Sequence, residues 1–288
     1  MAEVFGAVAG AIGIAALFNN CIDCFDYIQI ARHFGDDFSK YQLRLDVAKC
    51  RLSRWGAAIN VNSDPRFSNN TSKDQTTTLA ETLLGEIVAR FESAQKSSLL
   101  YKTVSRDQEM QVCSEADLGA VPQRLHSHLR TLTMHRQNRV GLTKKAYWAI
   151  YDKNKMGRMI DDIFDLINDL EKVFPATPQA TSRLVEMEIK EVNDQQVLKM
   201  IQDTAQDLDP ILADTTKRKL QEITGQNTAR YISGKGRTNI GHTFVNDSFV
   251  QSKRFYDSTF NHVDEINLDE TARVNIGNTY GGKGFWDS

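Results

Sequence analysis

Hydrophobic residues recur at helical spacing along most of the first 215 residues. Over residues 36–60 they fall three or four positions apart, the spacing that lines one face of an α-helix. They are Tyr41, Leu45, Ala48, Leu52 and Trp55. Asp36 or Asp37 could cap this helix, and Gly56 would weaken its end.

The same period continues along the chain and predicts further helices. They cover residues 76–103, 115–137, 142–173 and 181–204. An Asn- and Ser-rich stretch at 60–75 predicts a loop, and the letters FPATP at 174–178 predict a break. No segment in this part shows the strict alternation of a half-buried strand. The pattern therefore predicts an all-α bundle in which each helix buries one stripe.

Residues 4–22 form an apolar run without a single charge, directly after Glu3. The run is near the minimum of roughly 17–25 residues for crossing a bilayer. Gly6 and Gly10 form a G-x-x-x-G pair, with Gly13 close by, and such small residues let helices pack closely in lipid. The pattern alone slightly favours a buried core helix. However, each glycine costs a helix in water about 1 kcal/mol relative to alanine, which suits a segment that inserts into membranes conditionally.

The last 64 residues, 225–288, differ in composition from the rest of the chain. They hold eight of the 17 glycines and none of the five prolines, and they are rich in Asn, Ser and Thr. Their apolar residues form only small islands, so a single chain buries little apolar surface there. This composition predicts a tail that is disordered in the soluble state, with a boundary near residues 215–225.

The tail contains one short sequence motif twice. RTNIGHTF at 237–244 and RVNIGNTY at 273–280 share five of eight letters at a spacing of 36 residues. Two copies are too few to cover each other's open faces, but copies from other molecules could supply the missing neighbours. Stacking of this kind is the arrangement of a cross-β assembly. The alternative is a flexible tail with a chance repeat.

Two details of the repeats fit such stacking. Gly241 and Gly277 occupy the same repeat position, where glycine would turn the chain at a corner, with Ile240 and Ile276 pointing inward just before it. The stretch 225–246 carries Arg230, Lys235 and Arg237, whereas the second copy is acidic through Asp264, Glu265, Asp269 and Glu270, with Arg273 as its one cation. Alternating copies would therefore set a basic layer against an acidic one.

Global composition excludes several function classes. The net charge is -2, so no basic excess points to nucleic acid. The start of the chain has no Lys or Arg before its apolar run, which argues against a secretory signal and for a cytosolic protein. Four cysteines are too few for a disulfide scaffold, and CIDC at 21–24 lacks the context of a redox or zinc site.

No catalytic motif is present. The chain contains no G-x-S-x-G, P-loop, G-x-G-x-x-G or H-E-x-x-H sequence. His126, His128 and His135 have no acidic or cysteine partner at ligand spacing, so we expect them to be solvated polar positions. We expect no enzymatic activity, no cofactor and no metal site.

The repeats, their spacing and the ending GNTYGGKGFWDS resemble the HET-s/HET-S proteins of filamentous fungi. Four stretches of the N-terminal part resemble the HeLo domain of that family: FNNCIDCFDYIQIARHFG, YQLRLDVAKCRLSRWG, DPRF and FESAQKSS. The similarity covers nearly the whole chain. It implies a HeLo-like helical domain over 1–222 with a membrane-insertion segment 1–34. It also implies a prion-forming domain over 218–288 with repeats at 225–245 and 261–280.

The resemblance further implies that the tail forms a β-solenoid amyloid with two windings per molecule, against which Phe285 and Trp286 fold back. The residues expected to act in membrane insertion are Glu3, Phe5, Gly6, Gly10, Gly13, Phe18 and His33. The residues expected in the amyloid core are Arg237, Ile240, Gly241, Phe244, Val263, Ile266, Arg273, Val274, Ile276, Gly277, Tyr280, Phe285 and Trp286.

The implied function is a cell-death effector of heterokaryon incompatibility. Templating of the tail would deform the helical domain and release its N-terminal segment into the plasma membrane, whereas the resting protein would be cytoplasmic. The expected partners are further copies of the chain, a related prion-form protein or a NOD-like receptor with a matching amyloid motif, and membrane lipids. An inactive prion-type member, which forms amyloid and regulates a toxic partner without inserting, is the alternative.

Two features depart from, or vary within, the family pattern. At an offset of 36, Lys235 faces Thr271 and Ser233 faces Asp269, so the direct pairing of opposite charges is expected to be absent. The register before Arg237 is left open. Small changes near the end of the first helix separate toxin-competent from inactive members. His33 stands in IARHFG, with no helix-breaking proline, which favours the toxin-competent form.

Overall fold

The computed structural model describes residues 13–67, 74–104, 111–137, 147–223, 227–240, 261–269 and 271–276. The chain divides into two compact units. The helical unit comprises residues 1–192 and 200–215, and the tail unit comprises residues 193–199 and 216–288. The functional limits expected from the sequence, 1–222 and 218–288, remain predictions.

The described residues are mostly helical, which confirms the predicted all-α fold of the helical domain. The helices are α1 (Ile14–Asp26), α2 (Asp37–Ala58), α3 (Gln75–Val104), α4 (Ala120–Gln137), α5 (Lys153–Val173), α6 (Pro178–Ile189), α7 (Gln195–Ala205) and α8 (Pro210–Ile223). Short 3-10 turns lie at Arg32–Phe34, Pro65–Phe67 and Glu115–Asp117. None of the helices in these described ranges has the length and apolar character needed to cross a bilayer.

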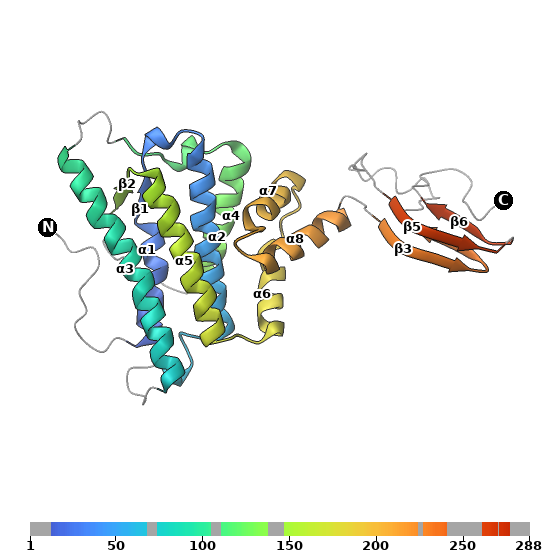
Figure 1. Cartoon of the computed structure of the whole chain (residues 1–288), viewed down its shortest axis with the longest axis horizontal. Helices are drawn as coiled ribbons and strands as arrows, with labels where there is room; N and C mark the ends of the chain where they lie inside the picture. Colours follow the sequence, from blue (N-terminus) through green and yellow to red (C-terminus); the bar gives the residue numbers. More distant parts are fainter. Residues whose placement is uncertain are drawn as a thin grey trace. The chain divides into compact units, whose positions relative to one another are not determined.

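Helix α2 is the centre of the helical unit. It packs against α1, α4, α5 and α6, while α3 packs against α1 and α5 (Figure 1). Because neighbours surround it, α2 buries almost every residue from Leu43 to Gly56, charged ones included. The other helices bury apolar stripes, as α5 does with Ile160, Ile163 and Ile167.

The helix limits differ from the sequence prediction in several places, among them the region 115–137, whose α-helix starts only at Ala120. Within the predicted helix 142–173, Trp148–Ile150 form a strand, and the helix starts only at Lys153, capped by Asp152. The region 181–204 is two helices, α6 and α7. Asp36 makes no capping hydrogen bond at the start of α2, and Asp37 instead pairs with Lys153 Nζ at 2.6 Å.

The helical unit also contains strands, which the sequence did not predict. β1 (Ile28–Ile30) and β2 (Trp148–Ile150) pair in parallel, with Ile28 opposite Trp148. Three residues are too few to show an alternating pattern, and all three residues of β2 are buried. The segment 28–34, which follows α1, is thereby fixed to the residues that precede α5.

The two repeats of the tail are paired strands. β3 (Asn227–Gly234) pairs in parallel with β5 (Asn261–Leu268), and β4 (Arg237–Ile240) pairs in parallel with β6 (Arg273–Ile276). Composition predicts disorder for a soluble tail, whereas here each repeat supplies the backbone hydrogen-bond partners of the other. Each of these sheets has two strands within the described residues.

Candidate functional site

Helix α1 is held in the helical unit by a close contact with α2. Phe18 of α1 is buried, and its ring centroid lies 6.0 Å from that of Trp55. The same ring lies directly on Gly56. A Cβ atom added there would come within 2.9 Å of Phe18 Cε1 and closer still to Cε2 and Cζ. Gly56 therefore makes room for Phe18, and the sequence prediction that it only weakens the helix end was incomplete.

Polar contacts support the same docking along the length of α1. Asn19 donates to Asn62 Oδ1 at 2.8 Å, and the Cys21 thiol donates to the Leu84 carbonyl at 3.1 Å. Asp26, the last residue of α1, accepts a hydrogen bond from Lys49 Nζ at 2.6 Å. These contacts tie α1 to α2 and α3 through ordinary side-chain interactions, which are reversible.

The thiols of α1 are sealed from solvent. Cys21 and Cys24 are completely buried, and burial raises the pKa of both thiols far above the usual range of cysteine. Cys50 on α2 is buried in the same way. Departure of α1 from its site would expose Cys21 and Cys24 to a thiol reagent, so these two residues report on docking.

The residues expected to act in membrane insertion fall into two groups. Glu3, Phe5, Gly6 and Gly10 lie outside the described residues. Gly13 precedes the first turn of α1 in an extended conformation, and Phe18 makes the contact with Gly56. His33 follows β1 and donates from Nε2 to the Tyr151 carbonyl at 2.7 Å, which joins it to the start of α5.

Gly56→Ala should loosen α1 selectively. The new methyl group overlaps the Phe18 ring, and overpacking of this kind costs about 1–3 kcal/mol. We expect faster modification of Cys21 and Cys24, measured by peptide mass spectrometry, with a smaller change at Cys50. Gly85→Ala is the matched control, since no atom lies within 4 Å of the added Cβ. Equal labelling of the two variants would contradict this role of Gly56.

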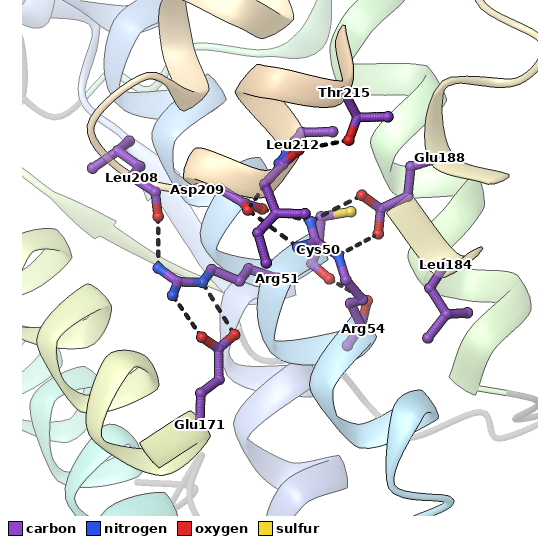
Figure 2. A network of polar contacts seen from close by, with 12 residues as sticks. Cys50, Arg51, Arg54, Glu171, Leu184, Glu188, Leu208, Asp209, Leu212 and Thr215 are labelled. Atoms are coloured by element: carbon purple, nitrogen blue, oxygen red, sulfur yellow. Dashed lines mark hydrogen bonds and ion pairs between the residues drawn. The ribbon is translucent and has the colours of Figure 1, made fainter. Parts of the chain in front are cut away.

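A buried ionic network surrounds Arg54, the residue that precedes Trp55 and Gly56 on α2 (Figure 2). Arg54 of α2 donates to both oxygens of Glu188 on α6 at 2.9 Å, and to Asp209 at 3.1 and 2.5 Å. Arg136 of α4 pairs with the same Glu188 at 2.7 Å. Burial lowers the pKa of Arg54, but Glu188 and Asp209 outweigh it and raise that pKa well above its usual value.

This network holds the start of α8. Asp209 precedes Pro210, and its Oδ1 accepts a hydrogen bond from the backbone of Leu212, which caps the helix. Arg51 donates to the Leu208 carbonyl at 2.7 Å and to both oxygens of Glu171 on α5 (Figure 2). The residues just before α8 are therefore fixed to the C-terminal part of α2 by two arginines.

A second polar cluster surrounds His126. This histidine is buried on α4, and its Nδ1 lies 2.8 Å from Asp46 Oδ2 on α2. The expectation of a solvated His126 was wrong, because the sequence did not show that Asp46 would face it. His128 likewise bonds the Glu188 carbonyl through Nε2 at 2.5 Å. The cluster borders a cavity of about 220 Å³, which is also lined by Phe25, Asp26 and Lys49.

In the tail, the register changes between the two pairs of strands. Asn227 pairs with Asn261, an offset of 34, whereas Arg237 pairs with Arg273, an offset of 36. The second repeat has two more residues between its strands than the first. The spacing of 36 that the repeated letters show thus holds only from Arg237 onward.

The shift in register restores a charge pair. Lys235 Nζ lies 3.5 Å from Asp269, and the pairs on either side place Arg230 opposite Asp264. The expectation that direct pairs of opposite charge are absent was therefore wrong, because it carried the offset of 36 back past Arg237. Arg237 lies opposite Arg273, so like charges stack at that position.

The remaining amyloid-core residues occupy matching positions where the structure describes them. Ile232 lies opposite Ile266, Val263 opposite Ala229, and Ile240 opposite Ile276. Val274 faces Thr238. Asn275 Nδ2 donates to Asn239 Oδ1 at 2.8 Å, a ladder contact between equivalent repeat residues. The other predicted core positions lie outside the described residues: Gly241, Phe244, Gly277, Tyr280, Phe285 and Trp286.

Two other glycines mark the turn that the structure describes. Gly234 and Gly236 both have φ of +140°, a conformation that side-chain-bearing residues rarely adopt. The Gly236 carbonyl also accepts a hydrogen bond from the Arg273 backbone at 2.8 Å. Sequence reasoning passed over these glycines because they lie outside the repeated letters, although G-K-G between two strand-like stretches is a turn signal.

Two family models match the chain. The HeLo model, described as "Prion-inhibition and propagation", matches residues 6–201. The model "Het-s 218-289" matches residues 219–281. The first covers the bundle that docks α1, and the second covers the paired repeats.

Curated relatives and solved structures agree with these matches. The chain is 40% identical over 290 residues to heterokaryon incompatibility protein s of Podospora anserina and equally to protein S of the same fungus, with full coverage of both chains in each case. The HET-S N-terminal domain structure is 41% identical, with a TM-score of 0.73, and covers 77% of this chain and all of its own. The structure of a HET-s N-terminal domain with two substitutions is 40% identical, with a TM-score of 0.70, and covers 74% of this chain and all of its own.

Proposed function

This chain belongs to the HET-s/HET-S family of prion-related heterokaryon incompatibility proteins, and on that premise we propose that it is an amyloid-templated cell-death effector that disrupts membranes. Self-assembly through its prion-type tail is a property of the family. We further propose that the resting protein is cytoplasmic and that its N-terminal segment is released into the plasma membrane. It is not an enzyme, since its relatives are heterokaryon incompatibility proteins and its HeLo model is described by prion inhibition and propagation.

The observation that carries this proposal is the docking of α1. An apolar run without charges continues from Val4 into α1, and α1 is covered by α2 and α3. Its contacts include the Phe18 ring on Gly56, the Phe25 ring centroid 4.9 Å from that of Phe91, hydrogen bonds to Asn62 and Leu84, and an ion pair with Lys49. Such contacts can be given up together, and the freed segment would then be better solvated by lipid than by water.

The paired repeats support the assembly step. A single chain leaves Ile266, Leu268 and Ile276 partly exposed on β5 and β6. Stacking of β5 and β6 onto β3 and β4 of a second copy would cover these side chains and place an acidic edge on a basic one. We therefore propose the two-winding β-solenoid as the assembled form of the tail.

The network around Arg54 suggests how assembly reaches α1. Helix α8 ends at Ile223 and β3 begins at Asn227, so a tail that joins a fibril pulls on a helix whose start is fixed by Asp209. Asp209 is held by Arg54, and the next two residues of α2, Trp55 and Gly56, hold Phe18. Loss of the Asp209 contact would thus disturb the site of α1.

The partners we propose are further copies of this chain, a related prion-form protein or a NOD-like receptor with a matching amyloid motif, and membrane lipids. A second candidate is an inactive prion-type member that never inserts. Equal identity to protein s and protein S does not separate the two. His33, bonded to Tyr151 in place of a helix-breaking proline, favours the toxin-competent form.

Full-length protein should release dye from liposomes only when preformed fibrils of residues 218–288 are added. Ala11→Arg should abolish this release, because a charge at the bilayer centre costs at least roughly 2.5–3.5 kcal/mol. Ala120→Arg, at an exposed position of α4, is the matched control and should keep it. Fibril growth without dye release would identify the inactive prion type. Unchanged release from Ala11→Arg would refute insertion of this run.

A further inference from the structure

The buried cluster around His126 lies next to the last turn of α1. Asp46 of α2 accepts from His126 Nδ1 at 2.8 Å through one oxygen and from Gln42 Nε2 at 3.1 Å through the other. The other ring nitrogen of His126, Nε2, lies 3.5 Å from Glu115. Glu115 in turn pairs with Arg130 of α4.

This geometry fits the charged form of histidine. Both ring nitrogens face carboxylates, and only the imidazolium can donate from both. A neutral ring would point a lone pair at one of the two carboxylates and would leave Asp46 without its cationic partner. The residues around His126 thus favour its protonated form.

Lys49 connects this cluster to α1. It lies three residues after Asp46 on α2, almost fully buried, and its ammonium group bonds Asp26 at 2.6 Å. Lys49 also acts electrostatically on the Asp46 carboxylate. Lys49 therefore lies between two carboxylates: Asp26 on α1, the helix proposed to be released, and Asp46 on α2, which stays in the bundle.

We propose that His126 is a switch that sets how firmly α1 is held. When His126 is protonated, it satisfies Asp46, and Lys49 stays with Asp26. When His126 loses its proton, Asp46 draws Lys49 away from Asp26 and the end of α1 is loosened. Alkaline pH would therefore prime the protein for release of α1, a consequence that rests on the function proposed above.

Linkage gives the same direction. Burial raises the pKa of Asp46 and exceeds the opposing effect of its bond to His126. Burial lowers the pKa of His126, but Asp46 and then Glu115 outweigh it and raise that pKa above the ordinary value. The folded state therefore binds protons here more tightly than the unfolded chain. The stabilisation of the folded state by protonated His126 is complete below the ordinary histidine pKa and is lost as pH rises through the raised pKa of His126.

Among the residues that the structure describes, the other charged or titratable groups lining the same cavity are Glu115, Arg130, Lys49, Asp26, Cys113 and Tyr147. Arg130 pairs with Glu115, and Cys113 is partly exposed with a raised pKa owing to its burial. Asp46 and His126 are the pair with direct contact across α2 and α4, so they determine the pH at which Lys49 is drawn away.

The test measures modification of Cys21 and Cys24 by 4,4′-dithiodipyridine in the full chain, relative to the urea-unfolded chain at the same pH. This ratio removes the intrinsic pH dependence of thiol reactivity. From pH 6 to pH 8.5 we expect protection to fall on the order of tenfold, the effect of losing one hydrogen bond between charged groups. Cys50 should change much less.

Variants separate the switch from a structural role. H126Q, permanently neutral, should be loosened at every pH, whereas D46N should stay protected and lose its pH dependence. The double variant D46N/H126Q should regain protection, because Lys49 has no competing carboxylate. A wild-type ratio that is flat or rises with pH, or a D46N profile like the wild type, overturns the proposal.

Seeded dye release distinguishes this proposal from the membrane function. Labelling that follows the predicted pH profile without dye release at any pH would support the switch and refute the membrane function. Dye release together with pH-independent labelling would support the membrane function and refute the switch.

Discussion

Glu188→Ala should lower the free energy of unfolding of the helical unit by about 3–5 kcal/mol. The Glu188 side chain is completely buried and pairs with both Arg54 and Arg136. Alanine would leave the buried guanidinium group of Arg54 with Asp209 as its remaining ion-pair partner and would take a carboxylate partner from the partly buried Arg136. An uncompensated buried charge costs far more than an intact pair contributes. Urea denaturation followed by tryptophan fluorescence measures the loss.

Glu171→Ala is the matched control for this prediction. Glu171 binds Arg51 with the same two-oxygen geometry, but its side chain is 35% exposed and Arg51 keeps the Leu208 carbonyl. Water can replace the lost carboxylate, so we expect a cost of roughly 1 kcal/mol or less. Equal losses for the two variants would show that burial of the Arg54 network does not determine its strength.

The long helices could be predicted from the sequence because each buries one apolar stripe. Residues 36–60 and 76–103 match α2 and α3 within two residues. Periodicity could not show that α2 is surrounded on several sides. For that reason the charged residues of its buried faces, Asp46, Lys49 and Arg54, could not be identified as candidate site residues. Their partners come from segments far away in the sequence, such as His126 and Asp209.

The repeats of the tail were predictable in part. Identity between the two copies gives the pairing of β4 with β6, because the same letters stand opposite one another there. It gives no register for β3 and β5, where Arg230 faces Asp264 and Tyr231 faces Glu265. A two-residue difference in loop length separates the two registers, and single-sequence reasoning has no means to locate such a difference.

Helix α2 joins the two candidate sites through three consecutive residues. Arg54 holds Asp209 at the start of α8, Trp55 donates to the Phe174 carbonyl at 2.9 Å and contacts Phe18, and Gly56 lies under the Phe18 ring. A rigid helix transmits a displacement from one of these residues to the next. On the mechanism proposed above, we expect that weakening Asp209 also loosens α1.

Gly236→Val should nearly abolish seeded fibril growth while the helical unit stays folded. A β-branched residue at φ of +140° is strained by about 1–3 kcal/mol, and the strain recurs in every chain added to the fibril. The change also threatens the bond from Arg273 to the Gly236 carbonyl, which joins the two repeats. Because each 1.4 kcal/mol is tenfold, growth followed by thioflavin fluorescence should slow by about tenfold or more.

Lys235→Val, at the exposed residue between the two glycines, is the control for this change. It adds the same side chain without a positive φ and removes only a solvent-exposed pair with Asp269, so growth should fall far less. If Lys235→Val blocked growth as strongly as Gly236→Val, charge pairing between the repeats would outweigh backbone conformation. If neither slowed it, this turn would lie outside the assembled core.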